Sequence, residues 1–115
     1  MIAWVLILIS GWPSPFENLM TAVTRSERGK PGVVYGPEYR IPMKEALKGY
    51  TINAAKQIGK EKELGSLTVG KRADLLIVNA DPVQIANEDP NNIEKIIVVS
   101  THIGGREFIH QRMLK

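Results

Sequence analysis

The feature that most constrains the fold is an uninterrupted apolar run near the start of the chain. Residues 2–9 read Ile-Ala-Trp-Val-Leu-Ile-Leu-Ile. A strand with one solvated face alternates apolar and polar residues, whereas a strand buried on both faces is continuously apolar. The run therefore predicts a buried strand, which needs parallel neighbours on each side and helices over its faces. The sequence offers no such strand before it, so we expect a segment cut from a larger fold.

The same run is a poor targeting or membrane segment. It has no basic residues before it, no small-residue cleavage site after it, and far fewer residues than the roughly 20 that span a bilayer. No membrane partner is expected.

Helical signals follow as far as residue 59. Ser14 and Pro15 predict a helix start, with Glu17 placed to complete a capping box, and the charged stretch from Arg25 to Gly29 ends the helix. Its apolar face would consist of Phe16, Leu19, Met20 and Val23. Residues 29–40 are predicted to form a loop, because glycine and proline recur there.

Two shorter helices are expected next. Pro42 opens the first, interrupted at Gly49, and Thr51 caps the second, which stops at Gly59. Their packed faces would consist of Met43, Ala46, Leu47 and Tyr50, then Ala54, Ala55 and Ile58.

Short β segments replace helices in the second half. Strands are predicted at residues 65–69 and 74–78, separated by a turn at Gly70-Lys71, and residues 79–92 are expected to be a polar excursion. Gly104-Gly105 predicts a tight hairpin between strands at 95–103 and 106–109. The chain is therefore assigned to the α+β class, with one part at residues 1–62 and another at 63–115.

Charge and cysteine content exclude several functions. The net charge of +3 comes from 15 basic and 12 acidic residues that are interleaved along the chain, and aromatic residues make up only 6%. Nucleic-acid binders instead gather their basic residues on one face, so no nucleic-acid partner is expected. With no cysteine, disulfides and thiolate metal sites are excluded, which is typical of a cytoplasmic protein.

An ordered set of short segments resembles the C-terminal end of the metal-dependent amidohydrolases, more closely the group called amidohydrolase family 3. These segments are Ser10-Gly11-Trp12-Pro13, Thr21 to Arg25, Glu45-Ala46-Leu47, Tyr50 to Ala55, Leu64 to Leu67, Gly70 to Leu75, Asp81-Pro82 and Thr101 to Arg106. The resemblance implies the last strand and helices of a (β/α)₈ barrel, followed by antiparallel strands of a small β-sandwich. In such barrels catalytic groups lie at the C-terminal ends of the strands, which here is the position of Ser10 and Gly11.

Gly11 departs from the family pattern Ser-Asp-Trp-Pro. In the family this Asp is a metal ligand and takes a proton from the metal-bound water that attacks the amide carbon, and glycine has no side chain for either task. The family's other ligands, a His-x-His pair among them, have no counterpart in this chain. The resemblance implies a divalent metal, typically zinc, in the family, whereas for this chain we expect no cofactor, no metal ligand and no catalytic residue.

Other candidate residues have structural explanations. Ser10 and Trp12 are left as possible ligand contacts, although Trp12 would equally cover the barrel end. His102 and His110 are expected to be ordinary histidines, Asp74 to bond turn amides, and Glu61 and Glu63 to be solvated. Ser14 is expected to be a helix cap and not a nucleophile. No phosphate loop is predicted, because Gly65, Gly70, Gly104 and Gly105 precede no helix.

Three hypotheses on function remain open. The first is a fragment of a hydrolase acting on non-peptide carbon–nitrogen bonds, inactive as an isolated chain. The second is a non-catalytic interaction or oligomerisation module that pairs through Ile2 to Ile9, because an apolar unpaired strand seeks a partner. The third is a split enzyme whose missing barrel portion is supplied by another chain.

Overall fold

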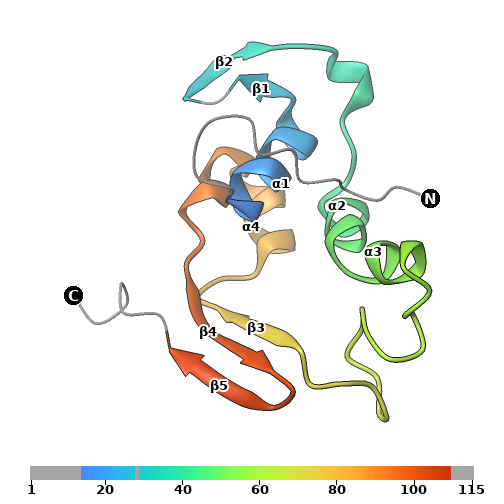
Figure 1. Cartoon of the computed structure of the whole chain (residues 1–115). Coiled ribbons are helices and arrows are strands. Elements are labelled where there is room, and N and C mark those ends of the chain that lie inside the picture. The colour runs from blue at the N-terminus through green and yellow to red at the C-terminus, as the bar shows by residue number, and fades with distance from the viewer. Residues whose placement is uncertain (1–13, 28, 110–115) are drawn as a thin grey trace.

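The structure is a computed structural model that describes residues 14–27 and 29–109, and it is a mixed α/β fold with antiparallel sheets (Figure 1). The predicted strand at residues 2–9 lies outside the described residues. The elements are, in order, α1 (Pro15–Thr24), β1 (Ser26–Glu27), β2 (Lys30–Val34), η1 (Pro37–Tyr39), α2 (Met43–Tyr50), α3 (Ile52–Gln57), β3 (Leu75–Val78), α4 (Pro82–Glu88), η2 (Pro90–Lys95), β4 (Val98–Ile103) and β5 (Arg106–Ile109).

Helix α1 begins and ends as its sequence predicts. The Ser14 Oγ accepts a hydrogen bond from the Glu17 amide at 3.5 Å, and Pro15 stands at the first helical position. Three of the four predicted core positions are buried, and Val23 is partly buried against the same cluster. Arg25 ends the helix in a left-handed conformation, with φ of 59°, and its amide donates to the Thr21 carbonyl.

The loop prediction for residues 29–40 was wrong, because this stretch contains β2 and the 3₁₀ helix η1. Strand β2 pairs antiparallel with β1, and the Tyr35 amide closes the ribbon by donating to the Arg25 carbonyl at 3.0 Å. Each strand of a two-stranded ribbon is an edge strand. Proline, which has no amide hydrogen to donate, is tolerated in edge strands, and β2 accommodates Pro31. The ribbon is exposed along β2, which explains why no apolar alternation marked it.

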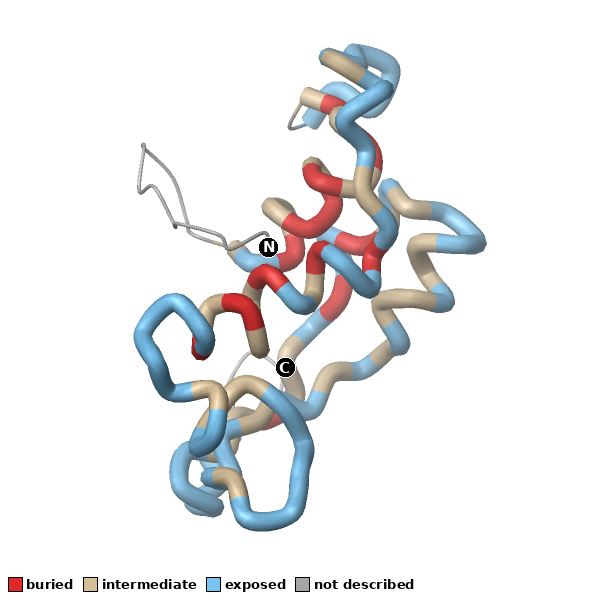
Figure 2. Tube along the Cα trace, turned by 90° about the vertical axis from the view of Figure 1, so that its right-hand side faces the viewer, coloured by how far each residue is buried: buried red, intermediate tan, exposed pale blue. Residues whose placement is uncertain are grey.

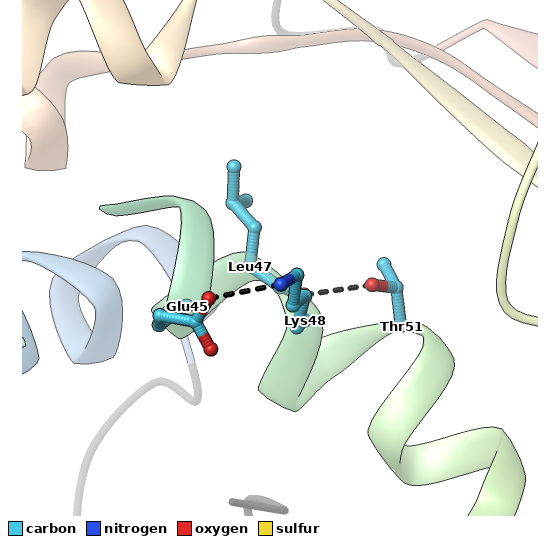
Figure 3. A network of polar contacts seen from close by, with 4 residues as sticks. All are labelled: Glu45, Leu47, Lys48 and Thr51. Carbon is cyan, nitrogen blue, oxygen red and sulfur yellow. Dashed lines mark hydrogen bonds and ion pairs between the residues drawn. The ribbon is translucent and has the colours of Figure 1, made fainter. Parts of the chain in front are cut away.

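The boundary between α2 and α3 lies at Thr51, and not at Gly49 as predicted. Gly49 is buried inside α2. Thr51 has the position of an N-cap for α3, but its Oγ1 turns back to donate to the Leu47 carbonyl at 2.8 Å, beside a Lys48–Glu45 ion pair of 2.9 Å (Figure 3). Ala55 is buried as predicted, whereas Ile58, placed on the packed face by its spacing, is 68% exposed.

The strand predicted at residues 65–69 is absent from the described part of the chain. The backbone turns instead, with the Lys71 amide donating to the Thr68 carbonyl and the Arg72 amide to the Glu63 carbonyl. Leu67 and the β-branched Val69 are almost fully exposed, and no strand of the described part of the chain pairs with this segment. The turn predicted at Gly70-Lys71 is present.

The polar excursion predicted for residues 79–92 was also wrong, since α4 and η2 occupy it. The Asp81 carboxylate accepts from the amides of Val83 and Gln84, and Asp89 accepts from Asn91 at the start of η2. Each Asp-Pro pair is thus an N-cap followed by a proline in the first turn, which is a helix-start signal as well as a turn signal.

The C-terminal hairpin is confirmed, although its first strand begins at Val98 and not at Lys95, because η2 extends to Lys95. Strands β3, β4 and β5 form an antiparallel sheet in that order, with Leu75 opposite His102 and His102 opposite Glu107. Gly104 and Gly105 connect β4 to β5 with positive φ values of 58° and 82°, the backbone that a tight two-residue hairpin turn demands.

One buried cluster joins the two halves of the chain. Figure 2 shows the buried positions gathered together while the outlying loops are exposed. The cluster consists of Phe16, Leu19, Met20, Ala22, Met43, Ala46, Ile93 and Ile96. Its members come from both sides of residue 62, and the division of the chain at that point stays a prediction. In the described ranges, no helix has the length and apolar character needed to cross a bilayer.

Candidate functional site

The residues predicted to lie at the catalytic position, Ser10 and Gly11, and the possible ligand contact Trp12 lie outside the described residues. The first described residue after them is Ser14, whose hydroxyl caps α1. Its structural role as a helix cap is confirmed.

Asp74 ties the start of β3 to the hairpin turn. Its Oδ1 accepts a hydrogen bond from the Gly104 amide at 2.7 Å, and an Arg72 guanidinium nitrogen lies 3.7 Å from the same oxygen. The adjacent Ala73 carbonyl accepts from the Gly105 amide at 3.0 Å. The prediction that Asp74 bonds turn amides is confirmed. The turn is the one between β4 and β5, and its Gly104 lies 30 positions after Asp74 in the chain.

Glu61 and Glu63 differ in their surroundings. Glu63 forms an exposed ion pair with Lys60 at 3.4 Å, as expected of a solvated side chain. Glu61 is half-buried, and its Oε2 is shielded from solvent without a hydrogen-bond partner among the described residues. The prediction that Glu61 is solvated was therefore wrong. Among the described residues, no histidine joins these two carboxylates to form an acid–base site.

His102 lies on the central strand β4. His110, which was likewise predicted to be an ordinary histidine, lies outside the described residues. The His102 ring is half-buried, and its Nδ1 is enclosed without a hydrogen-bond partner. Over residues 14–27 and 29–109, no three His, Asp or Glu side chains come together in a way that could hold a metal ion. Because a hydrolytic metal site normally needs three protein ligands, the described residues do not fit one.

Sequence reasoning missed a pair of arginines at the C-terminal end of α1. The Arg25 Nε donates to the Tyr35 carbonyl at 3.1 Å, and the Arg40 Nε donates to the Thr24 carbonyl at 3.0 Å. The signal that could have found them is an arginine directly after a helix, where glycine is the usual residue.

The chain matches known proteins over most of its length. The model of the amidohydrolase family matches residues 10–109. The chain is 37% identical to an N-substituted formamide deformylase of Arthrobacter pascens over 95 residues, which are 83% of this chain and 17% of that protein. It is 51% identical over 49 residues to an imidazolonepropionase of Shewanella baltica, covering 42% of this chain and 12% of the relative.

A third relative is an imidazolonepropionase of Shewanella frigidimarina, which is 43% identical over 61 residues, or 52% of this chain and 15% of the relative. The matched segment thus spans less than a fifth of the length of these relatives. No solved structure matches the chain.

Proposed function

The chain belongs to the amidohydrolase family, and from this premise we propose that it is part of a hydrolase for non-peptide carbon–nitrogen bonds that is inactive as an isolated chain. The relatives' names refer to an N-substituted formamide and to imidazolonepropionate. We extend only the shared chemistry to this protein: an amide-type carbon–nitrogen bond in a small molecule.

The identity of residue 11 carries the proposal that the isolated chain is inactive. Attack on an amide carbon needs a water molecule that is held and deprotonated, and a carboxylate can do both beside a metal ion. Position 11, where the family motif has that carboxylate, is glycine. The described residues do not supply the three ligands that a metal would need, so no catalytic step is assigned to them.

The architecture supports a structural role for the described residues. We propose that α1, α2 and α3 are the last helices of a (β/α)₈ barrel and that the sheet β3-β4-β5 is one share of a β-sandwich. This sheet displays apolar side chains that a second layer would cover: Leu76 is 52% exposed, Ile103 is 54% exposed and Phe108 is 45% exposed. Sandwich sheets bury such residues against a facing sheet.

The experiment measures metal content and amide hydrolysis on the purified chain. The chain is incubated with zinc, desalted and analysed for metal per protomer, then assayed with an N-substituted formamide as substrate. We expect neither stoichiometric metal nor turnover, and the Gly11→Asp variant is expected to behave in the same way, because one carboxylate does not complete a metal site.

The deformylase of Arthrobacter pascens serves as the positive control of the assay. One tightly bound metal ion per protomer, together with turnover that a chelator abolishes, would contradict the proposal of an inactive chain. Turnover restored by a second polypeptide would instead support the split-enzyme hypothesis, in which a missing barrel portion is the partner.

A non-catalytic oligomerisation module remains the second candidate, and the exposed apolar side chains favour it. Leu67 and Val69 are 85% and 104% exposed, in addition to the apolar residues of the sheet. Such surfaces are typical of contact regions, and the apolar run at residues 2–9 would add to them. Light scattering at micromolar concentration should then detect a dimer or larger assembly, and a monodisperse monomer would exclude this candidate. A cytoplasmic location stays a prediction.

A further inference from the structure

Arg25 adopts a backbone conformation that arginine rarely adopts. Its φ of 59° and ψ of 19° place it in the left-handed region, and it is the one non-glycine residue with positive φ in the described ranges. Glycine occupies such C-terminal positions without steric cost, whereas a side chain is strained there. A residue held in this region despite its steric cost is a candidate for a functional role.

The Arg25 guanidinium lies close to the backbone of Gly36. Its Nε donates to the Tyr35 carbonyl at 3.1 Å. A Cβ placed on Gly36 would lie 3.6 Å from an Arg25 terminal nitrogen and 2.9 Å from the Tyr39 ring. An Arg25 terminal nitrogen and the Tyr39 ring thus both lie close to Gly36, which has no side chain. Tyr39 is 68% exposed.

Arg40 is oriented by a similar bond. Its Nε donates to the Thr24 carbonyl at 3.0 Å, and Thr24 directly precedes Arg25 in the chain. In both arginines the Nε is occupied by a main-chain oxygen, which limits the side-chain conformations. The terminal nitrogens, which form the fork that binds planar oxyanions, are not used by these two bonds.

The nearby carboxylates do not neutralise either arginine. Glu27 pairs with Lys30 at 3.1 Å, and Glu38 is exposed within η1. Across the described part of the chain, neither Arg25 nor Arg40 has a carboxylate oxygen within 4.0 Å. Arg40 is exposed and Arg25 is half-buried, and neither guanidinium has a counter-ion from these residues.

We propose that Arg25, Arg40 and Tyr39, here named the arginine surface, bind an oxyanion, either a carboxylate or a phosphate group. The guanidinium groups would donate charge-assisted hydrogen bonds to its oxygens, and the Tyr39 hydroxyl is available as a further donor. Figure 1 shows the β1–β2 ribbon, which Arg25 directly precedes in the chain, at the end of the molecule away from the sheet β3-β4-β5. This inference does not depend on hydrolase activity.

The test is an NMR titration of the full chain labelled with ¹⁵N. Sodium phosphate and sodium acetate are added in separate arms, and sodium chloride at matched ionic strength corrects for screening. We expect saturable shifts at the amides of residues 24–26 and 36–40. Arg25→Gln and Arg40→Gln should each weaken the affinity about tenfold, because each removes charge-assisted bonds.

Arg72→Gln is the matched control, since it removes the same charge at the opposite end of the molecule and should leave the affinity unchanged. Arg40→Lys keeps the charge and loses the fork, so an intermediate affinity is expected and shows that planar recognition matters. Saturation in only one arm would identify the anion as phosphate or carboxylate. Absence of saturable shifts in both arms, or equal weakening by Arg72→Gln, would overturn the proposal.

Discussion

At the scale of single residues, two glycines with nearly the same positive φ have opposite surroundings. Gly65 and Gly70 have φ values of +93° and +94°. A Cβ at Gly65 would lie 2.8 Å from the Ala55 Cβ and 2.9 Å from the Ile52 Cα, whereas a Cβ at Gly70 would meet nothing within 4 Å. The comparison separates backbone strain from a steric clash.

We predict that Gly65→Ala destabilises the protein more than Gly70→Ala. Both variants carry the left-handed strain of about 1 kcal/mol, and only Gly65→Ala adds overpacking of about 1–3 kcal/mol against helix α3. Urea unfolding followed by circular dichroism measures the two free energies. Equal losses would show that the Ile52 and Ala55 contacts yield without cost.

Asp81 is the residue that starts helix α4, and its removal should cost about 1 kcal/mol of stability. Its Oδ1 accepts from the Val83 amide at 2.8 Å and from the Gln84 amide at 3.4 Å, which Asp81→Ala would leave without a protein partner. Asp81→Asn retains the acceptor oxygen and serves as the control, with an expected loss of only a few tenths of a kcal/mol. Thermal unfolding would detect the difference.

At the scale of elements, the hairpin β4–β5 is tied to the start of β3 through its own turn. The bonds from the Gly104 amide to Asp74 and from the Gly105 amide to the Ala73 carbonyl are the ties. They satisfy two amides of the turn and fix the hairpin against its neighbouring strand.

We predict that Asp74→Ala destabilises the protein by about 1 kcal/mol, since one hydrogen bond to a carboxylate is lost at a partly exposed position. Hydrogen exchange at the Gly104 amide should accelerate by about fivefold or more, which corresponds to that free energy. Asp74→Asn keeps an acceptor oxygen and should retain most of the protection. Unchanged exchange in Asp74→Ala would mean that the bond contributes nothing to the turn.

At the scale of the whole molecule, η2 completes the core that α1 and α2 begin. Ile93 is fully buried and Ile96 is 6% exposed in the cluster with Leu19, Met20 and Ala46. The next residue, Ile97, is 45% exposed, so the two isoleucines form a natural comparison.

We predict that Ile93→Ala costs about 2–5 kcal/mol of unfolding free energy, because it opens a cavity in the centre of the cluster. Ile97→Ala removes the same atoms from a half-exposed site and should cost about 1 kcal/mol or less. A loss for Ile93→Ala as small as that for Ile97→Ala would show that the cluster is not the core that holds α1 and η2 together. Denaturant unfolding of both variants provides the measurement.

Local signals determined much of this protein directly from sequence. Ser14-Pro15 determined the start of α1, Gly104-Gly105 determined the hairpin turn, and the family resemblance rested on short motifs in order. These features depend on a few adjacent residues, whose side chains bond or shape their own backbone. The identity of residue 11, on which the proposed inactivity depends, is likewise a property of the sequence alone.

Only the tertiary structure decided which apolar segments found a partner. Leu67 and Val69 have strand-forming side chains but no pairing strand, whereas β2 pairs with β1 despite its proline and glycine. The sequence predicts a polar excursion at residues 79–92, but Ile85 and Ala86 of α4 pack against the core. Strand pairing and helix burial depend on residues distant in the chain, and local composition does not encode those distances. For the same reason local sequence does not reveal the arginine surface, since Arg40 reaches the Thr24 carbonyl, next to Arg25, only in the folded chain.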